Sequence, residues 1–122
     1  MNPMSIVEIK NLSRPLHQPL QVAYCKDFGC KLRGLTFRRA LAMDEGLLMD
    51  NLRESKLDSA IHMMGVFFDL GIIWLGEDLK VIDRQFARRW LSILSPSRPA
   101  RYILEVHPDR LGEFEIGHEI SY

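Results

Sequence analysis

Apolar and polar residues alternate over short segments along most of this chain, which is the period-two pattern of strands that bury one face. Turn-forming residues separate these segments at close spacing, and no regular strand–helix–strand alternation is visible, so a doubly wound sheet is not expected. The pattern predicts extended segments at 5–11, 20–25, 46–52, 59–66, 68–75, 79–86, 100–107 and 117–122.

Helical patterns are few. Residues 34–42 (GLTFRRALA) have helical spacing next to a glycine, and residues 109–114 predict one helical turn after a proline. Residues 76–78 (Gly-Glu-Asp) predict the turn of a hairpin. Short strands with one or two short helices indicate a mainly β domain, either a compact antiparallel β-sandwich or a small barrel.

The most apolar run is IHMMGVFFDLGIIWL, residues 61–75. On a strand, both of its faces would be apolar, so it predicts a central strand that is buried on both sides. Asp69 lies within the run as a structural acid that holds a loop or an arginine, as an acid or base in a pocket, or as an acid at a turn outside the strand. His62 has two interpretations: a hydrogen-bonded residue at the rim of the core, or a ligand or catalytic group.

Composition restricts the class of protein without naming an activity. The 122 residues fit a single domain, 1–122, and the formal net charge of zero gives no general attraction to nucleic acid or to an acidic membrane surface. Zero net charge is compatible with a homodimer. Neither a signal peptide nor a membrane span is visible, so we expect a soluble cytoplasmic protein. Cys25 and Cys30 are then expected as reduced thiols, with a disulfide as the alternative.

Residues 34–49, GLTFRRALAMDEGLLM, resemble the signature of an uncharacterised prokaryotic family, the domain of unknown function 192. The apolar run and ARYILE at 100–105 follow in the family's order, so the resemblance covers about residues 22–120. It implies a compact, mainly β fold. It supplies no catalytic residue, because the family has no established activity. The acid of the family's central strand corresponds to Gly71 here, and Asp69 lies two residues earlier.

A basic stretch with interleaved aromatic residues offers a candidate binding surface. Between residues 80 and 101 there are six basic residues and one acid. Arginine beside aromatic rings is one way in which proteins hold single-stranded nucleic acid, but a solvated face is the more common use of such a stretch. We therefore expect a surface for an unknown small ligand or protein, rather than for nucleic acid, around Arg84, Arg88, Arg89 and Trp90.

The sequence favours a small, non-enzymatic module that binds a ligand or a partner. Signatures of nucleophiles, phosphate loops and dinucleotide sites are missing, and the four histidines lack metal-ligand spacing, so neither a metal nor a cofactor is expected. One alternative is a hydrolase or metal-dependent enzyme that uses Asp69, Glu45 and His62. Glu45 could instead form a structural ion pair with Arg38 or Arg39. A self-associating structural domain is the third hypothesis.

Overall fold

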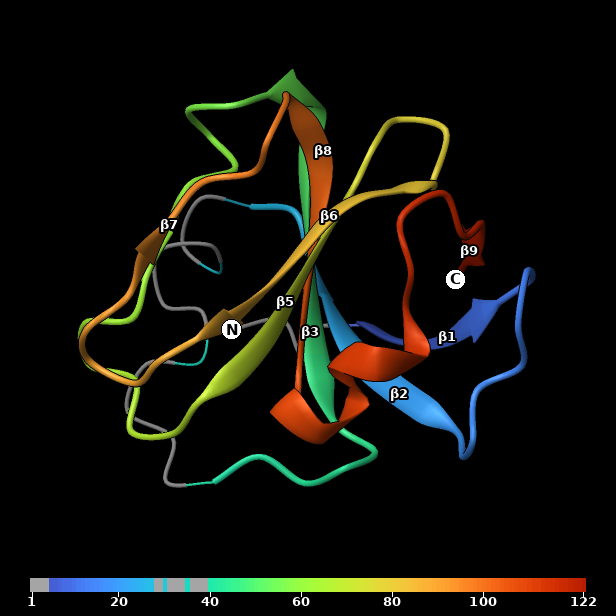
Figure 1. Ribbon diagram of the computed structural model, residues 1–122, viewed down its shortest axis with the longest axis horizontal. Helices are drawn as coiled ribbons and strands as arrows, with labels where there is room; N and C mark the ends of the chain where they lie inside the picture. Colours follow the sequence, from blue (N-terminus) through green and yellow to red (C-terminus); the bar gives the residue numbers. More distant parts are fainter. Residues whose placement is uncertain (1–4, 28–29, 31–34, 36–39) are drawn as a thin grey trace.

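Short β-strands make up most of the regular structure, which confirms the prediction of a mainly β fold (Figure 1). The computed structural model describes residues 5–27, 30, 35 and 40–122. The element η1 (Pro108–Glu113) is a 3-10 helix. The strands are β1 (Ser5–Asn11), β2 (Leu20–Cys25), β3 (Gly46–Ser55), β4 (Ile61–His62), β5 (Leu70–Leu75), β6 (Val81–Ala87), β7 (Ile93–Leu94), β8 (Ala100–Val106) and β9 (Ile120–Ser121).

Seven strands form one curled sheet in the order β6-β5-β8-β3-β2-β1-β9. The pairs are antiparallel except for β2 and β3, which run parallel, so the antiparallel expectation holds for every pair of this sheet but one. The two edges of the sheet meet at one end. There the Val81 amide donates to the His118 carbonyl at 2.9 Å, and the Ile120 amide donates to the Leu79 carbonyl at 2.9 Å. The sheet is therefore a half-barrel closed at one end, nearer to the small barrel than to the sandwich.

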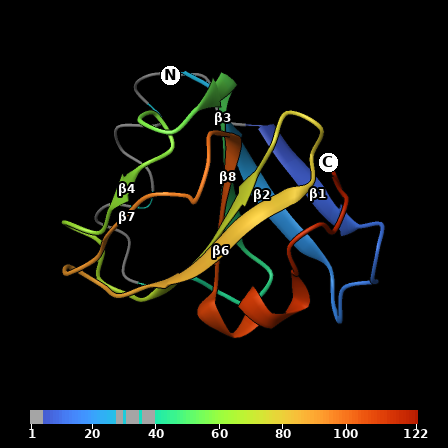
Figure 2. The ribbon, with the colours of Figure 1, turned by 45° about the horizontal axis from the view of Figure 1, so that its top comes forward.

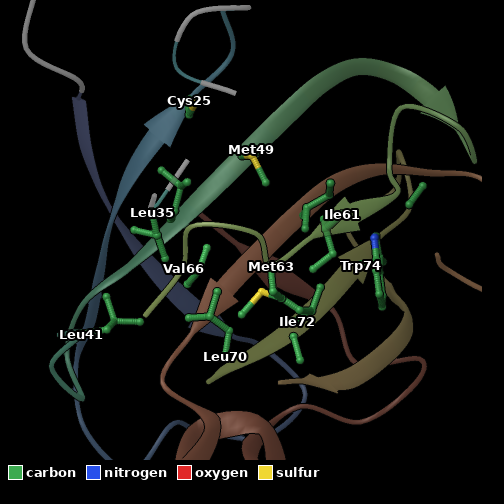
Figure 3. Close-up of a cluster of buried hydrophobic side chains, with 14 of the residues drawn as sticks. Cys25, Leu35, Leu41, Met49, Ile61, Met63, Val66, Leu70, Ile72 and Trp74 are labelled. Atoms are coloured by element: carbon green, nitrogen blue, oxygen red, sulfur yellow. The ribbon is translucent and has the colours of Figure 1, made fainter. Parts of the chain in front are cut away.

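The two faces of the curled sheet carry separate cores. Alternation along β5 sends Ile73 into the concave core, which also contains Phe114, the residue after η1. Figure 2 shows η1, in orange-red, at one end of the curled sheet. Ile72 points into the outer core instead. Figure 3 shows Met63 and Val66, which precede β5 in the chain, packed in that outer core. Strands β4 and β7 form a separate two-stranded sheet beside it.

The apolar run 61–75 is divided by a turn and does not form one long strand. Gly65 has a φ of 82°, and the Val66 amide donates to the Met63 carbonyl at 3.0 Å between β4 and β5. The prediction of a strand over 59–66 is therefore wrong outside β4. Met63 and Val66 are apolar because the turn covers the outer core, and an apolar run alone does not distinguish such a cover from a strand. All six residues of β5 are buried, as the run predicts.

Most other predicted elements match the structure. The strands over 5–11 and 20–25 are confirmed, as is the hairpin turn at 76–78 between β5 and β6. The predicted final edge strand is β9, which pairs with β1 at the edge of the sheet. The predicted helix over 34–42 lies largely outside the described residues. No helix in the described part of the chain has the length and apolar character that crossing a membrane requires.

Cys25 and Cys30 form a disulfide, with their Cα atoms 5.8 Å apart, so the expectation of reduced thiols is wrong. Cys25 ends β2 and is buried in the outer core. The Cys30 amide donates to the Asp27 carboxylate at 2.7 Å, which turns the chain back toward β2. Sequence spacing alone does not reveal this turn, and without it the two Cα atoms need not come within bonding range.

A fully buried arginine fastens η1 to two loops. The Arg110 side chain is 0% exposed, and its Nε donates to the Glu113 carboxylate at 2.7 Å. Its remaining N–H groups donate to the same carboxylate and to the backbone carbonyls of Gln18, Pro19 and Met43. All five guanidinium donors are therefore used, which is the condition under which a buried charge is tolerated.

Candidate functional site

Asp69 anchors a loop. It lies just before β5 and is partly buried, and its carboxylate accepts a hydrogen bond from the Arg89 amide at 2.9 Å. The structural interpretation of Asp69 therefore describes its geometry: it holds the segment after β6 against the segment before β5. Since Asp69 precedes β5, the prediction that it lies within a strand is wrong.

The structure does not gather Asp69, Glu45 and His62 into one cluster. The Glu45 carboxylate accepts a hydrogen bond from the Ala42 amide at 2.9 Å, and His62 is exposed on β4. Across the described residues, no group of three or more His, Cys, Asp or Glu side chains is arranged to hold a metal ion. The expected ion pair of Glu45 with Arg38 or Arg39 concerns residues outside those described.

The four residues of the predicted binding surface divide into two sets. Arg84 is partly buried on β6, and its Nη1 donates to the Leu111 carbonyl at 3.1 Å, so it contacts η1. Arg88, Arg89 and Trp90 follow β6 on an exposed turn. Two hydrogen bonds hold the backbone of this turn. The Arg89 amide donates to the Asp69 carboxylate, and the Arg88 amide donates to the Ser92 hydroxyl at 2.7 Å.

Trp90 has an unusual backbone conformation. Its φ of 62° lies in the left-handed region, which is uncommon for a bulky residue and costs free energy. The Trp90 amide donates to the Met63 carbonyl at 3.2 Å. Trp90 is 49% exposed, and its indole ring lies edge-on to the Phe67 ring, with ring centroids 5.4 Å apart. The surrounding contacts thus fix the Trp90 side chain in an exposed position.

Large apolar side chains are exposed beside Trp90 on the same two loops and on β7. Exposure reaches 68% for Met64, 71% for Leu91 and 81% for Ile93. Hydrogen bonds from the Trp90 amide to Met63 and from the Arg89 amide to Asp69 hold the loops together, and Figures 1 and 2 place them with β4 and β7 at one side of the molecule. We define the Trp90 surface as Met64, Phe67, Trp90, Leu91 and Ile93, with Arg88 and Arg89 at its edge.

Glu105 is a buried acid that the sequence analysis did not single out. It lies on β8 between Leu47 of β3 and Ile72 of β5, both of which belong to the outer core. Its side chain is 6% exposed, and it has no hydrogen-bond or ion-pair partner among the described residues. Burial raises the carboxyl pKa to about 7. Strand alternation along 100–106 could have placed Glu105 on the same face as Ile103.

Asp50 is a second buried acid, but it is fully paired. Its carboxylate accepts hydrogen bonds from the Tyr24 hydroxyl at 2.5 Å, from Arg101 Nε at 3.0 Å and from the Leu52 amide at 2.7 Å. Burial alone would raise the pKa of Asp50, but the bonds from Arg101 and Tyr24 outweigh it and hold the pKa below its ordinary value. These contacts indicate a structural role at the irregular part of β3.

Comparisons with known proteins agree with the fold and leave the activity open. Residues 9–121 match the model of the domain of unknown function 192 family, described as "Uncharacterized ACR". A protein of uncharacterised protein family 0127 from Thermococcus gammatolerans is 40% identical over 52 residues, which cover 43% of this chain and 33% of that protein. A second member, from Thermococcus kodakarensis, is 34% identical over 71 residues, which cover 57% of this chain and 45% of that protein. The aligned part is thus less than half the length of either relative.

Two crystal structures share the architecture. A protein from Sinorhizobium meliloti, provisionally named a transcription regulator, superposes with a TM-score of 0.85 at 19% identity over 99% of this chain and 96% of its own. A protein of unknown function from Novosphingobium aromaticivorans gives a TM-score of 0.81 at 20% identity over 98% of this chain and 86% of its own. At such identities the likeness extends to the fold alone.

Proposed function

This chain belongs to the domain of unknown function 192 family, an uncharacterised family, and we propose that it is a binding module that docks a protein partner on the Trp90 surface. The observation that carries the proposal is the conformation of Trp90. Its backbone is held in the left-handed region while its ring stays half exposed. Strained residues that the surrounding structure holds in place cluster at active sites, ligand clamps and switch regions.

The composition of the Trp90 surface supports the same conclusion. Tryptophan and arginine are the residues most often found at the energetic centres of protein interfaces, and methionine and phenylalanine are enriched there. Scattered single apolar residues are normal on a protein surface, but these lie on adjoining segments that hydrogen bonds hold together. Because Phe67 braces the indole ring, little side-chain freedom would be lost on binding.

The enzymatic alternative has less support from the geometry. It requires Asp69, Glu45 and His62 to reach a common reacting atom. The carboxylates of Asp69 and Glu45 instead accept backbone amides from different loops. Glu105 has a pKa suited to acid–base chemistry, but its side chain is buried in the outer core and has little access to a substrate.

Site-specific photo-crosslinking in the native host tests the proposal. A photoreactive amino acid at Leu91, at the centre of the surface, should give a discrete adduct with one partner, and Trp90→Ala should abolish that adduct. The matched control is the same photoreactive amino acid at Leu57, which is 85% exposed and lies outside the surface. The proposal is overturned if both positions give the same adducts, or if the Leu91 adduct survives Trp90→Ala.

A further inference from the structure

We propose that the partner segment seated on the Trp90 surface is acidic as well as apolar, and that its carboxylates pair with Arg88 and Arg89. This inference rests on the proposed function and adds the chemistry of the partner. It follows from the two arginines at the edge of the surface, whose guanidinium groups form no ion pair within the described part of the chain.

The two arginines are available for a partner. Arg88 and Arg89 are both exposed, and their hydrogen bonds to other described residues are made by the backbone, not by the guanidinium groups. Asp69 is the carboxylate nearest to them in the loop contacts, and it accepts the Arg89 amide. The edge of the apolar surface therefore presents two cationic groups to solvent with no carboxylate of the described residues paired to them.

The position of the arginines specifies where the partner's acids must lie. Arg88 and Arg89 directly precede Trp90 in the chain, so a carboxylate that pairs with either must lie within one side chain's reach of the group that covers the indole. Guanidinium groups favour carboxylates because the two fit together through paired hydrogen bonds. A segment with acids beside large apolar residues would meet both requirements.

A second copy of this chain fits the surface less well. A two-fold interface uses the same patch on both protomers, so a dimer through the Trp90 surface would bring together two patches that both carry Arg88 and Arg89 at their edge. Like charges across an interface oppose association. A lipid surface also fits less well, because two arginines on a molecule with no net charge give only weak attraction to anionic headgroups.

Two synthetic peptides test the inference. They share the same leucine and phenylalanine positions, and their remaining positions are glutamate in one and lysine in the other. Isothermal titration at low salt should show that the glutamate peptide binds about tenfold more tightly, since two exposed ion pairs replace two repulsions. The double variant Arg88→Glu with Arg89→Glu should reverse this preference, and added salt should reduce it.

A second set of variants separates failure of this inference from failure of the proposed function. Trp90→Gly should abolish peptide binding without loss of folding, because glycine adopts a positive φ freely. Leu57→Ala is the control that should bind as wild type. Equal binding of both peptides, lost in Trp90→Gly, overturns the acidic partner and keeps the proposed function. Binding of the glutamate peptide that survives Trp90→Gly overturns both.

The remaining outcomes also decide the question. Vesicles of phosphatidylcholine and phosphatidylserine that bind the wild type but not Trp90→Gly would show that lipid is the occupant. A dimer in sedimentation analysis that Trp90→Gly dissolves would show that a second copy is the occupant. Either result overturns the acidic protein segment, as does the failure of both peptides to bind, while crosslinking at Leu91 independently decides the proposed function.

Discussion

Replacement of Glu105 by glutamine should stabilise the protein at alkaline pH and leave it nearly unchanged at acidic pH. Glu105 is buried between Leu47 and Ile72, and burial raises its carboxyl pKa from 4.5 to about 7. Glutamine has nearly the same shape as the protonated acid but never ionises. The variant therefore removes the cost of placing a charge in the outer core and little else.

The sign and size follow from proton linkage. Below pH 4.5 the carboxyl is protonated in both the folded and the unfolded chain, so the acid carries no ionisation penalty. As the pH rises, the unfolded chain releases this proton first, and the stability of the wild type falls until the folded chain ionises near pH 7. The full penalty is about 3 kcal/mol, at roughly 1.4 kcal/mol for each tenfold change in proton affinity. It is complete above pH 7.

Urea unfolding at a series of pH values from about 3.5 to about 8 measures this effect, since these limits lie roughly one pH unit beyond each transition. The difference in free energy of unfolding between Glu105→Gln and wild type cancels the other titrating groups. It should be near zero at the acidic limit and should approach about 3 kcal/mol in favour of the variant at the alkaline limit. Glu115→Gln, which removes an exposed carboxylate, is the matched control and should follow the wild type.

A Glu105→Gln variant that is less stable than wild type at alkaline pH would refute this reasoning. That result would mean that the folded chain favours the carboxylate through a cationic partner, so that loss of the charge costs more than its burial. A difference that does not change with pH would refute it as well, because it would show that Glu105 titrates alike in the folded and unfolded chains.

Three further perturbations test the polar contacts. Arg110→Met should lower the free energy of unfolding by about 3–5 kcal/mol, measured in urea, because Glu113 stays buried without its partner; a loss below ~1 kcal/mol would contradict the described clamp. Asp50→Asn should lower the free energy of unfolding by about 2 kcal/mol near neutral pH. The wild type itself loses this contribution as the pH falls below 3.8, so the two proteins should become equally stable in acid. Stability profiles that stay parallel down to acidic pH would contradict this prediction. Reduction of the Cys25–Cys30 disulfide should cost roughly 2 kcal/mol in thermal unfolding, and an unchanged midpoint would show that it constrains the unfolded chain very little.

Local patterns in the sequence predicted the local parts of the fold. The strands at 5–11 and 20–25 and the turn at 76–78 follow from alternation and turn chemistry within the segments themselves. The parallel pairing of β2 with β3 did not follow, because a strand's own residues do not identify its neighbour. The run 61–75 was ambiguous for a related reason: residues that cover a core from a turn are as apolar as residues within it.

For the candidate sites, too, the sequence predicted local features but not the contacts with distant segments. A loop-anchoring role for Asp69 could be inferred from an isolated acid in an apolar run, but its partner, the Arg89 amide twenty positions away, could not. Trp90 was selected for its neighbouring arginines, whereas its exposure and its positive φ became visible only in the fold. Glu105 was hidden because its burial depends on segments that cover β8 from elsewhere in the chain.

Closure of the sheet by its last strand affects the order of folding during synthesis. The segment that includes β9 pairs with β1, and it also bonds to Leu79 just before β6 and to Val81 at the start of β6. Until residues 117–121 have emerged from the ribosome, both β1 and the start of β6 are free sheet edges, which invite pairing with other chains. Because the pairing of β9 with β1 spans most of the sequence, it is slow to form. A nascent chain stalled shortly before residue 117 would therefore be an aggregation-prone intermediate, and this protein should benefit from a chaperone that shields strand edges until translation has passed that point.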